Sequence, residues 1–257
     1  MPTAAERYRQ EILRWFPRGG VHVFVGAGGK STAMRETARL LVSSGAKVRM
    51  TTTTRVGIEE FHGVSLRTCT TRQEVLAALA EEEPVLLIVA GKTADGRKYH
   101  GLPVDLVECL PLDASTVVLV EADGSRGLPM KVPRDHEPVI PADASSVIAV
   151  LGAAAFGERV DAEHCYNHES ALKILAVRDP AEARFGPGEI SILAASREAY
   201  RKGVTPGMAY RVLINQADLP DKRVIAQEAV QQMFERFGLR AALVSFRQGE
   251  MYDPAAR

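Results

Sequence analysis

The sequence predicts an α/β fold, a three-layer, doubly wound and mostly parallel sheet of about seven strands, and two observations carry this prediction. Short β-branched runs alternate along the chain with segments of helical periodicity. Most of these runs are continuously apolar, as parallel strands covered on both faces should be. The expected strands span residues 21–25, 47–53, 85–90, 116–121, 147–151, 211–215 and 241–246.

Helical segments with apolar stripes fill the intervals between the strands. The first, at about residues 4–16, precedes the first strand, so residues 1–257 are expected to form one domain with an N-terminal helix. Gly45 and Gly238 stand where glycine caps end helices, and Thr71 with Glu74 forms a capping box that opens a helix to about residue 83. The stripes are Tyr8, Ile12, Trp15 and Phe16; Met34, Ala38, Leu41 and Val42; Val75, Leu76 and Leu79; and Ala226, Val230, Met233, Phe234 and Phe237.

Two stretches break the alternation and are expected to be loops. Residues 91–111 are polar, and residues 123–144 hold several prolines and glycines that forbid a long helix or strand. A long ordered loop that directly follows a buried strand is more often functional than not.

Composition excludes several classes of protein. Lys+Arg and Asp+Glu are equal at 32 each, which argues against a protein held on nucleic acid or a membrane surface by bulk charge. No apolar run approaches the roughly 20 residues that cross a bilayer, and the N-terminus lacks the apolar region of a secretory signal. Three widely spaced cysteines, Cys69, Cys109 and Cys165, suit a reducing compartment. We therefore expect a cytoplasmic protein that binds neither membrane nor nucleic acid.

The strongest local motif is a glycine-rich loop between the first strand and its helix. Glycines let backbone N–H groups approach an anion, and the helix N-terminus adds partial positive charge. Lys30 is expected to reach the β- and γ-phosphates, and the Ser31 hydroxyl to bind Mg²⁺. The alternative is a plain glycine turn. The loop consists of Gly26, Ala27, Gly28, Gly29, Lys30, Ser31 and Thr32.

The spacing of this loop, G-x-x-G-K-S-T, is two residues shorter than the common P-loop, G-x-x-x-x-G-K-[ST]. The shorter form resembles the nucleotide loop of Mur-type ligases and folylpolyglutamate synthetases. The expected fold is therefore P-loop NTPase-like.

Other strand ends supply candidates that complete a nucleotide site. Glu121 and Asp123 follow an apolar strand in the place of a Walker B acid that holds Mg²⁺, although an acidic turn is the alternative. Thr52 and Thr53 lie in a run of four threonines that either continues a strand or offers hydroxyls to the γ-phosphate or Mg²⁺.

A second polar pair follows a later strand. Asn215 and Asp218 match the N-x-x-D that reads the base in many GTPases, but Gln216 stands where lysine is usual, so ATP and GTP both remain open.

The proline-rich loop gathers cations, a histidine and carboxylates. Lys131 or Arg126 could neutralise transferring phosphate oxygens, and His136 or Glu137 could do acid–base work. A solvated, proline-stiffened loop is the alternative.

Further along, Cys165 and His168 suggest a metal pair, but no second pair accompanies them, and a helix start near Asn167 is the stronger interpretation.

Taken together, these motifs resemble the YqeC family, described as accessory proteins of selenium-dependent molybdenum hydroxylases. The most specific part is E-A-D-G-S-R at residues 121–126, followed by L-P-M-K at 128–131 and H-E-P-V-I-P at 136–141. The resemblance implies a P-loop-type nucleotide-binding protein whose partner is a molybdenum hydroxylase or its cofactor machinery. The family-motif positions are Lys30, Ser31, Glu121, Asp123, Lys131, His136 and Glu137.

The function we expect is Mg²⁺-dependent binding and hydrolysis of ATP or GTP during maturation of that enzyme. Two alternatives stay open: an ATP-dependent ligase or nucleotidyl or phosphoryl transferase acting on a pterin-like substrate, and a non-catalytic chaperone gated by nucleotide.

Overall fold

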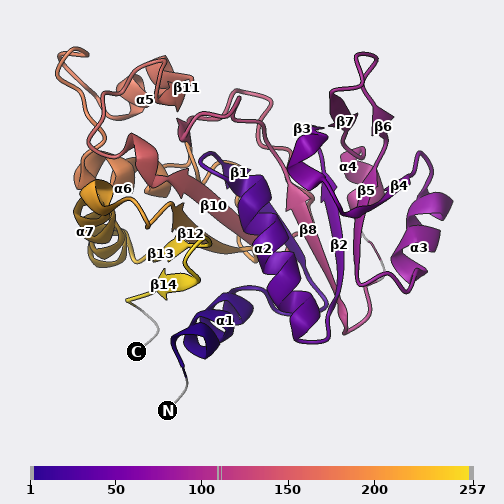
Figure 1. Cartoon of the computed structure of the whole chain (residues 1–257). Helices are drawn as coiled ribbons and strands as arrows, with labels where there is room; N and C mark the ends of the chain where they lie inside the picture. Colours follow the sequence, from indigo (N-terminus) through magenta and orange to yellow (C-terminus); the bar gives the residue numbers. More distant parts are fainter. Residues whose placement is uncertain (1–2, 109, 111, 255–257) are drawn as a thin grey trace.

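A nine-stranded sheet organises the computed structural model, which describes residues 3–108, 110 and 112–254 (Figure 1). Neighbouring strands run parallel except at one edge, where β13 and β14 are antiparallel. In spatial order the strands are β14 (Glu250–Tyr252), β13 (Arg240–Ser245), β12 (Ala209–Asn215), β10 (Ser146–Gly152), β1 (Val21–Gly26), β8 (Thr116–Glu121), β2 (Lys47–Thr52), β5 (Val85–Val89) and β4 (Ser65–Thr68).

The α/β class and all seven expected strands are confirmed, but the expected strand number was too low. The two unexpected strands, β4 and β14, are the edges of the sheet. An edge strand is covered less completely than a central one and can be short, so neither shows the continuous apolar run by which the central strands were recognised.

Helices cover both faces of the sheet, and each face has its own buried cluster. On one face, α1 (Ala4–Trp15) and α2 (Lys30–Ser43) pack with Phe24 of β1. On the other, α3 (Arg72–Ala80), α6 (Pro187–Ala195) and α7 (Pro220–Phe237) pack with Val23 and Val25. Successive β1 side chains therefore enter opposite cores, which explains why the strand is continuously apolar.

The helix signals are confirmed with two corrections. Thr71 and Glu74 form the capping box of α3, and Gly238 ends α7 with a φ of 62°. However, α3 ends at Ala80, three residues before the expected position. Phe234 and Phe237 were expected in the core but are 49% and 37% exposed, since α7 buries its small residues and Met233 instead.

The expected loop at residues 91–111 was wrong in part. It contains β6 (Gly91–Lys92) and β7 (Lys98–His100), which join β3 (Arg55–Gly57) in a small antiparallel sheet, and then α4 (Val104–Val107). Its strands are two or three residues long, too short to show a period. Cys109 and Pro111 lie outside the described residues.

Residues 123–144 are irregular as expected, apart from β9 (Met130–Lys131). This strand pairs with β11 (Cys165–Tyr166), just before α5 (His168–Ile174). Two 3₁₀ turns complete the fold, η1 (Glu59–Phe61) and η2 (Ala153–Ala155).

The sheet order places a crevice at the carboxyl end of β1. From β1 the chain moves past β8 to β2 on one side, while β10 and β12 extend the sheet on the other side. Where the order of the strands reverses, the loops after neighbouring strands turn to opposite faces of the sheet. A crevice then opens beyond the carboxyl ends of these strands, and ligands of such folds bind there. The glycine-rich loop lies at that point.

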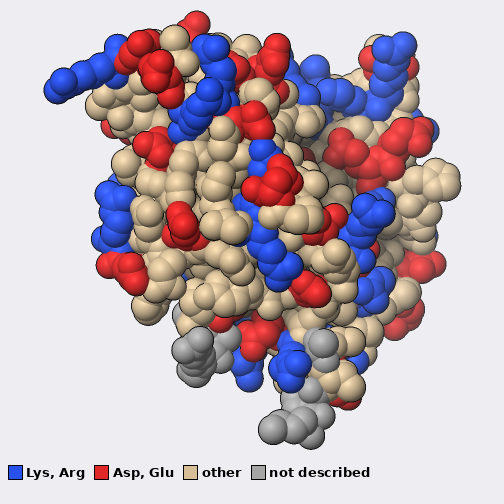
Figure 2. All heavy atoms as spheres, turned by 60° about the vertical axis from the view of Figure 1, so that its left-hand side comes forward, with Lys and Arg blue, Asp and Glu red and all other residues tan. Residues whose placement is uncertain are grey.

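The surface agrees with the balanced charge of the sequence. Figure 2 shows acidic and basic side chains intermixed over one face rather than gathered by sign. Among the described residues, no helix is both long enough and apolar enough to cross a membrane.

One buried histidine ties β1 to its surroundings. His22 is fully buried, its Nδ1 lies 2.7 Å from the Ser146 hydroxyl, and its Nε2 lies 2.8 Å from the carbonyl of Pro17. Burial lowers the pKa of this imidazole from 6.5 to about 4.

The His22 imidazole binds a proton more readily in the unfolded chain than in the folded one. We therefore expect the free energy of unfolding to fall as pH drops from 6.5 towards 4. The loss should reach roughly 3 kcal/mol. Urea unfolding of the native chain and of His22→Gln at a series of pH values measures it. The variant should lack this part of the slope, whereas His62→Gln, an exposed control, should keep it. Equal slopes for the native chain and His22→Gln would refute the assignment.

Candidate functional site

The glycine-rich loop forms the floor of a cleft of about 720 Å³. β1 ends at Gly26 and α2 begins at Lys30, with Gly29 as an N-cap that offers no side chain to the helix. The cleft is lined by Gly28, Gly29, Lys30, Ser31, Arg55, Gly57, Glu60, Lys98, Glu121, Gly124, Ser125, Arg126, Gly127 and Leu128. An uncapped helix N-terminus and a basic wall suit an anion.

Close backbone approach fixes the shape of the loop. Gly28 has a φ of +78°, and a Cβ there would lie 2.2 Å from the backbone of Gly152, at the end of β10. The side-chain amide of Asn215, at the end of β12, donates to the Gly28 carbonyl at 3.0 Å. Asn215 therefore braces the loop within the fold, and its predicted part in reading a base stays a prediction.

The buried carboxylate of Asp123 joins the loop to two lysines. The Gly26 N–H donates to its two oxygens at 3.0 and 2.9 Å. The Lys30 ammonium lies 3.3 Å away and the Lys131 ammonium 3.2 Å away. Asp123 is 1% exposed, so these interactions are shielded from water. Its observed role is to hold the loop and both cations in place.

Lys131 is fully buried, and its ammonium has three acceptors in all. Besides pairing with Asp123, it donates to the Gly124 carbonyl at 2.7 Å and to the Glu137 carboxylate at 2.9 Å. Partial burial raises the pKa of Glu137, but the bond from Lys131 outweighs it and holds that pKa below its usual value. Lys131 and Glu137 thus neutralise each other beneath the cleft, and neither lines it.

Ser31, Glu121 and Glu60 gather oxygen atoms beside Lys30. The Ser31 hydroxyl lies 3.0 Å from the Glu121 carboxylate and also contacts that of Glu60. Burial, with Glu60 nearby, raises the pKa of Glu121 although Lys30 opposes it. Burial lowers the pKa of Lys30, but Asp123 and Glu121 overcome this and raise it.

The oxygen donors around Ser31 fit Mg²⁺. This ion keeps several waters and takes only one or two carboxylates when phosphates supply other ligands. The described residues contain no cluster of three or more His, Cys, Asp or Glu arranged to hold a metal by themselves. A site made of Ser31 and Glu121, with Glu60 beside them, supplies the few carboxylates that Mg²⁺ needs without forming such a cluster.

Several expected site residues lie outside the cleft. The Thr52 hydroxyl donates to the Glu121 carbonyl and the Thr53 hydroxyl to the Val139 carbonyl, each at 2.8 Å. Asp218 lies after β12, where the Ser245 hydroxyl donates to it at 3.4 Å. His136 is exposed and lines a neighbouring hollow with Glu137.

The remaining loop residues, Ala27 and Thr32, and the suspected metal pair, Cys165 and His168, occupy positions that the packing of the fold explains. Ala27 is buried and its N–H donates to the Val150 carbonyl, while Thr32 is exposed in the first turn of α2. Cys165 is buried in β11, which raises the pKa of its thiol to about 12, and His168 begins α5 after the N-cap Asn167.

Sequence reasoning missed Glu60 and two basic residues of the same cleft, Arg55 and Lys98. Glu60 belongs to a 3₁₀ turn with no motif, and Arg55 and Lys98 come from the small β3–β7–β6 sheet. These residues meet the loop only through the tertiary fold, so no local pattern could have identified them.

Arg126 also lines the cleft, and its guanidinium stacks 5.0 Å from the centre of the Tyr166 ring. Arg134 and Lys131 lie over the same ring at 4.9 and 5.6 Å. Arg126 has a φ of 54°, an uncommon backbone conformation for a residue with a side chain.

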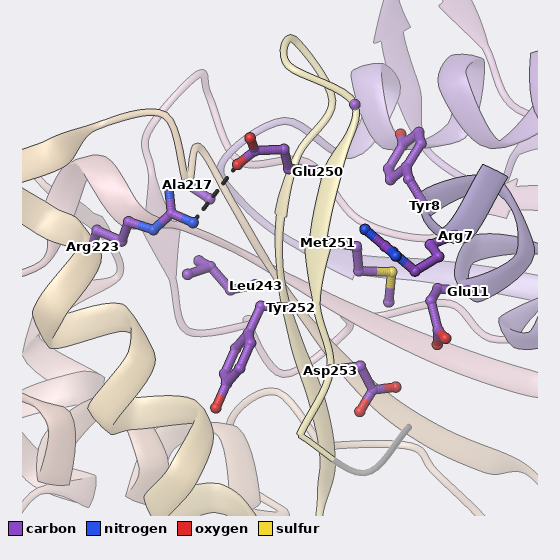
Figure 3. Close-up of a pocket in the computed structure, with 11 residues that line it drawn as sticks. Arg7, Tyr8, Glu11, Ala217, Arg223, Leu243, Glu250, Met251, Tyr252 and Asp253 are labelled. Atoms are coloured by element: carbon purple, nitrogen blue, oxygen red, sulfur yellow. Dashed lines mark ion pairs between the residues drawn. The ribbon is translucent and has the colours of Figure 1, made fainter. Parts of the chain in front are cut away.

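A separate hollow of about 540 Å³ lies at the β14 edge of the sheet. Figure 3 shows Arg7, Tyr8 and Glu11 of α1 on one side of the β13–β14 hairpin and Arg223 on the other. Arg223 pairs with Glu250 at 3.7 Å. No residue of the glycine-rich loop lines this hollow, so it is separate from the cleft that the loop forms.

Comparison with known proteins places the same motifs in one family. The family model described as YqeC protein matches residues 23–169. "Uncharacterized protein YqeC" of Escherichia coli (strain K12) is 28% identical over 210 residues, covering 81% of this chain and 80% of that protein. No solved structure gives a significant match.

The position of Asp123 makes its charge a stabilising element. We expect Asp123→Asn to lower the free energy of unfolding by about 3 kcal/mol, because it leaves two buried lysines with one fewer counter-charge. Denaturant unfolding near neutral pH measures the change, with Asp135→Asn as the exposed control. A loss as small as that of the control would contradict the role assigned to Asp123.

Proposed function

The chain belongs to the YqeC family, and we propose that it binds ATP or GTP with Mg²⁺ and hydrolyses it. One observation carries the proposal: the Ser31 hydroxyl lies 3.0 Å from the Glu121 carboxylate at the uncapped N-terminus of α2. A hydroxyl and an acid in this relation, next to a lysine and a glycine loop, are the parts of a P-loop phosphate site.

The loop supports binding of the phosphates through its backbone. The N–H groups of the first turn of α2 point out of the helix, where no side chain caps them. Lys30 adds a full positive charge within the cleft. On binding, its ammonium exchanges part of its contact with Gly26, Asp123 and Glu121 for phosphate oxygens.

Ser31 and Glu121 would hold Mg²⁺, with Glu60 close enough to hold one of its waters. The ion, when bound, neutralises charge on the β- and γ-phosphate oxygens. The raised pKa of Glu121 reflects burial near other carboxylates, and a divalent cation there would relieve that repulsion. This gives a physical reason for the ion and the nucleotide to bind together.

We assign the γ-phosphate contact to Arg126 rather than Lys131. Lys131 is buried and already paired, whereas Arg126 lines the cleft and is held by a ring contact. Such a contact at an exposed site contributes about 0.5–1 kcal/mol. Hydrogen bonds to a charged group contribute about 1.5–3 kcal/mol. The free energy therefore falls when the Arg126 guanidinium exchanges its contact with the Tyr166 ring for hydrogen bonds to phosphate.

Two further parts of the proposal concern the base of the nucleotide and the partner. Asn215 braces the loop and Asp218 follows it, which is the order of a base-reading motif, with ATP and GTP both compatible. From the likeness of residues 121–141 to the YqeC motifs, we propose a selenium-dependent molybdenum hydroxylase or its cofactor machinery as the partner. Nucleotide-dependent co-purification of that enzyme tests this role, and its failure to co-purify in any nucleotide state would count against it.

Ser31→Ala separates the phosphate site from the Mg²⁺ site. We expect it to weaken ATP or GTP binding roughly tenfold in Mg²⁺, since one ligand of the ion is lost, and to have little effect in EDTA. Isothermal calorimetry with both nucleotides measures the affinities. Ser43→Ala, at the other end of α2, is the matched control. Equal affinities for Ser31→Ala and the native chain in Mg²⁺ would refute the metal site.

Arg126→Gln tests the hydrolytic step. We expect phosphate release to slow on the order of 100-fold or more and nucleotide affinity to fall much less, by about tenfold at most, because the charge acts mainly on the transition state. Arg134→Gln, which removes the other arginine on Tyr166, should leave the rate nearly unchanged. Tight nucleotide binding without phosphate release by the native chain would instead favour a nucleotide-gated chaperone.

A further inference from the structure

A second hollow, of about 450 Å³, adjoins the phosphate cleft. Arg55 and Gly124 line both spaces, so the two meet at these residues. The volume lies within the range of small-molecule sites. The hollow is lined by Thr53, Thr54, Arg55, His100, Gly101, Gly124, His136, Glu137 and Val139.

Two strands and one loop build the walls of this hollow. Arg55 of β3 and His100 of β7 are register partners, so their side chains leave the small sheet on the same face. Gly101 follows at once, and a Cβ there would lie 2.3 Å from the Thr52 carbonyl. This close approach brings the small sheet against the end of β2.

The opposite wall is the proline-rich loop, which is fastened to the main sheet. The Val139 N–H donates to the Ala122 carbonyl at 3.0 Å, and the Val139 carbonyl accepts from the Thr53 hydroxyl at 2.8 Å. These bonds hold His136 and Glu137 beside the ends of β2 and β8.

The hollow has an excess of groups that bind oxyanions. Glu137 is the one carboxylate among the described residues that line it, and it is paired with buried Lys131 at 2.9 Å. Arg55 makes no hydrogen bond or ion pair through its side chain with any residue that the structure describes. His100 and His136 add two imidazoles. One uncompensated guanidinium with two imidazole donors suits a phosphate or carboxylate group.

We propose that this hollow binds a small second substrate through a phosphate or carboxylate group, which Arg55 holds beside the terminal phosphate of the nucleotide. The inference rests on the proposed nucleotide function, because it places the two ligands in adjoining spaces. It assigns Arg55, His100 and His136 to the second ligand and leaves Lys30, Ser31 and Glu121 to the nucleotide.

The test uses the full chain loaded with Mg²⁺ and a non-hydrolysable analogue of ATP or GTP, so that the phosphate cleft is filled. Inorganic phosphate and acetate are titrated separately, and the imidazole C–H signals are followed by NMR. We expect saturable shifts of the His100 and His136 signals with at least one of these anions. His62, exposed and outside the hollow, should not move. Comparison of the two anions identifies the preferred group.

Arg55→Gln should weaken the binding of that anion roughly tenfold, the effect of one lost charge-assisted hydrogen bond. Arg97→Gln, an exposed arginine of the same small sheet region, is the matched control and should bind as the native chain does. The inference is overturned if His100 and His136 stay unmoved in the loaded protein, or if Arg55→Gln binds like its control. Failure of the analogue itself to bind, seen by calorimetry beforehand, would refute the nucleotide function and with it this inference.

Discussion

The buried carboxylate of Asp123 is the interaction on which the candidate site depends. It accepts from the Gly26 N–H where β1 ends and pairs with Lys30 and Lys131. Two lysines that are 4% and 0% exposed would be costly without such a partner. One side chain therefore fixes the start of the glycine loop, the lysine of that loop, and the segment that carries Lys131.

The Asp123 carboxylate also lies between two sets of charged groups. On the cleft side of Asp123 lie Lys30, Ser31 and Glu121, which under the proposed function would contact a polyphosphate and Mg²⁺. On the other side of Asp123, the Lys131 ammonium donates to the Glu137 carboxylate and to the Gly124 carbonyl. Lys131 and Glu137 have all their partners within the fold and can act as a rigid support. Lys30, Ser31 and Glu121 could instead exchange their present partners for atoms of a ligand. Under the proposed function, that difference separates the residues that position the site from those that would bind the ligand.

Strand order explains why these groups meet. β8 lies directly beside β1, so Glu121 at the end of β8 stands next to the loop that follows β1. β10 lies on the other side, and its Gly152 allows Gly28 to approach its backbone. Asn215 reaches the same loop from β12, one strand further. Parallel strands bring their carboxyl ends to one edge, which makes residues far apart in sequence neighbours.

The sequence by itself determined the central strands, the helix caps and the loop from Gly26 to Thr32, because apolar period, cap chemistry and glycine placement are local. It also singled out Glu121 and Asn215, since both directly end apolar strands. Only the tertiary structure decided that Lys131 is buried against Asp123 and Glu137 and that Arg126 and Glu60 line the cleft. The tertiary structure alone brought Arg55 and His100, from strands of three residues, beside the cleft of the glycine-rich loop. Such roles depend on burial and on contacts between distant segments, and a short strand or an irregular loop leaves no periodic pattern from which those contacts can be predicted.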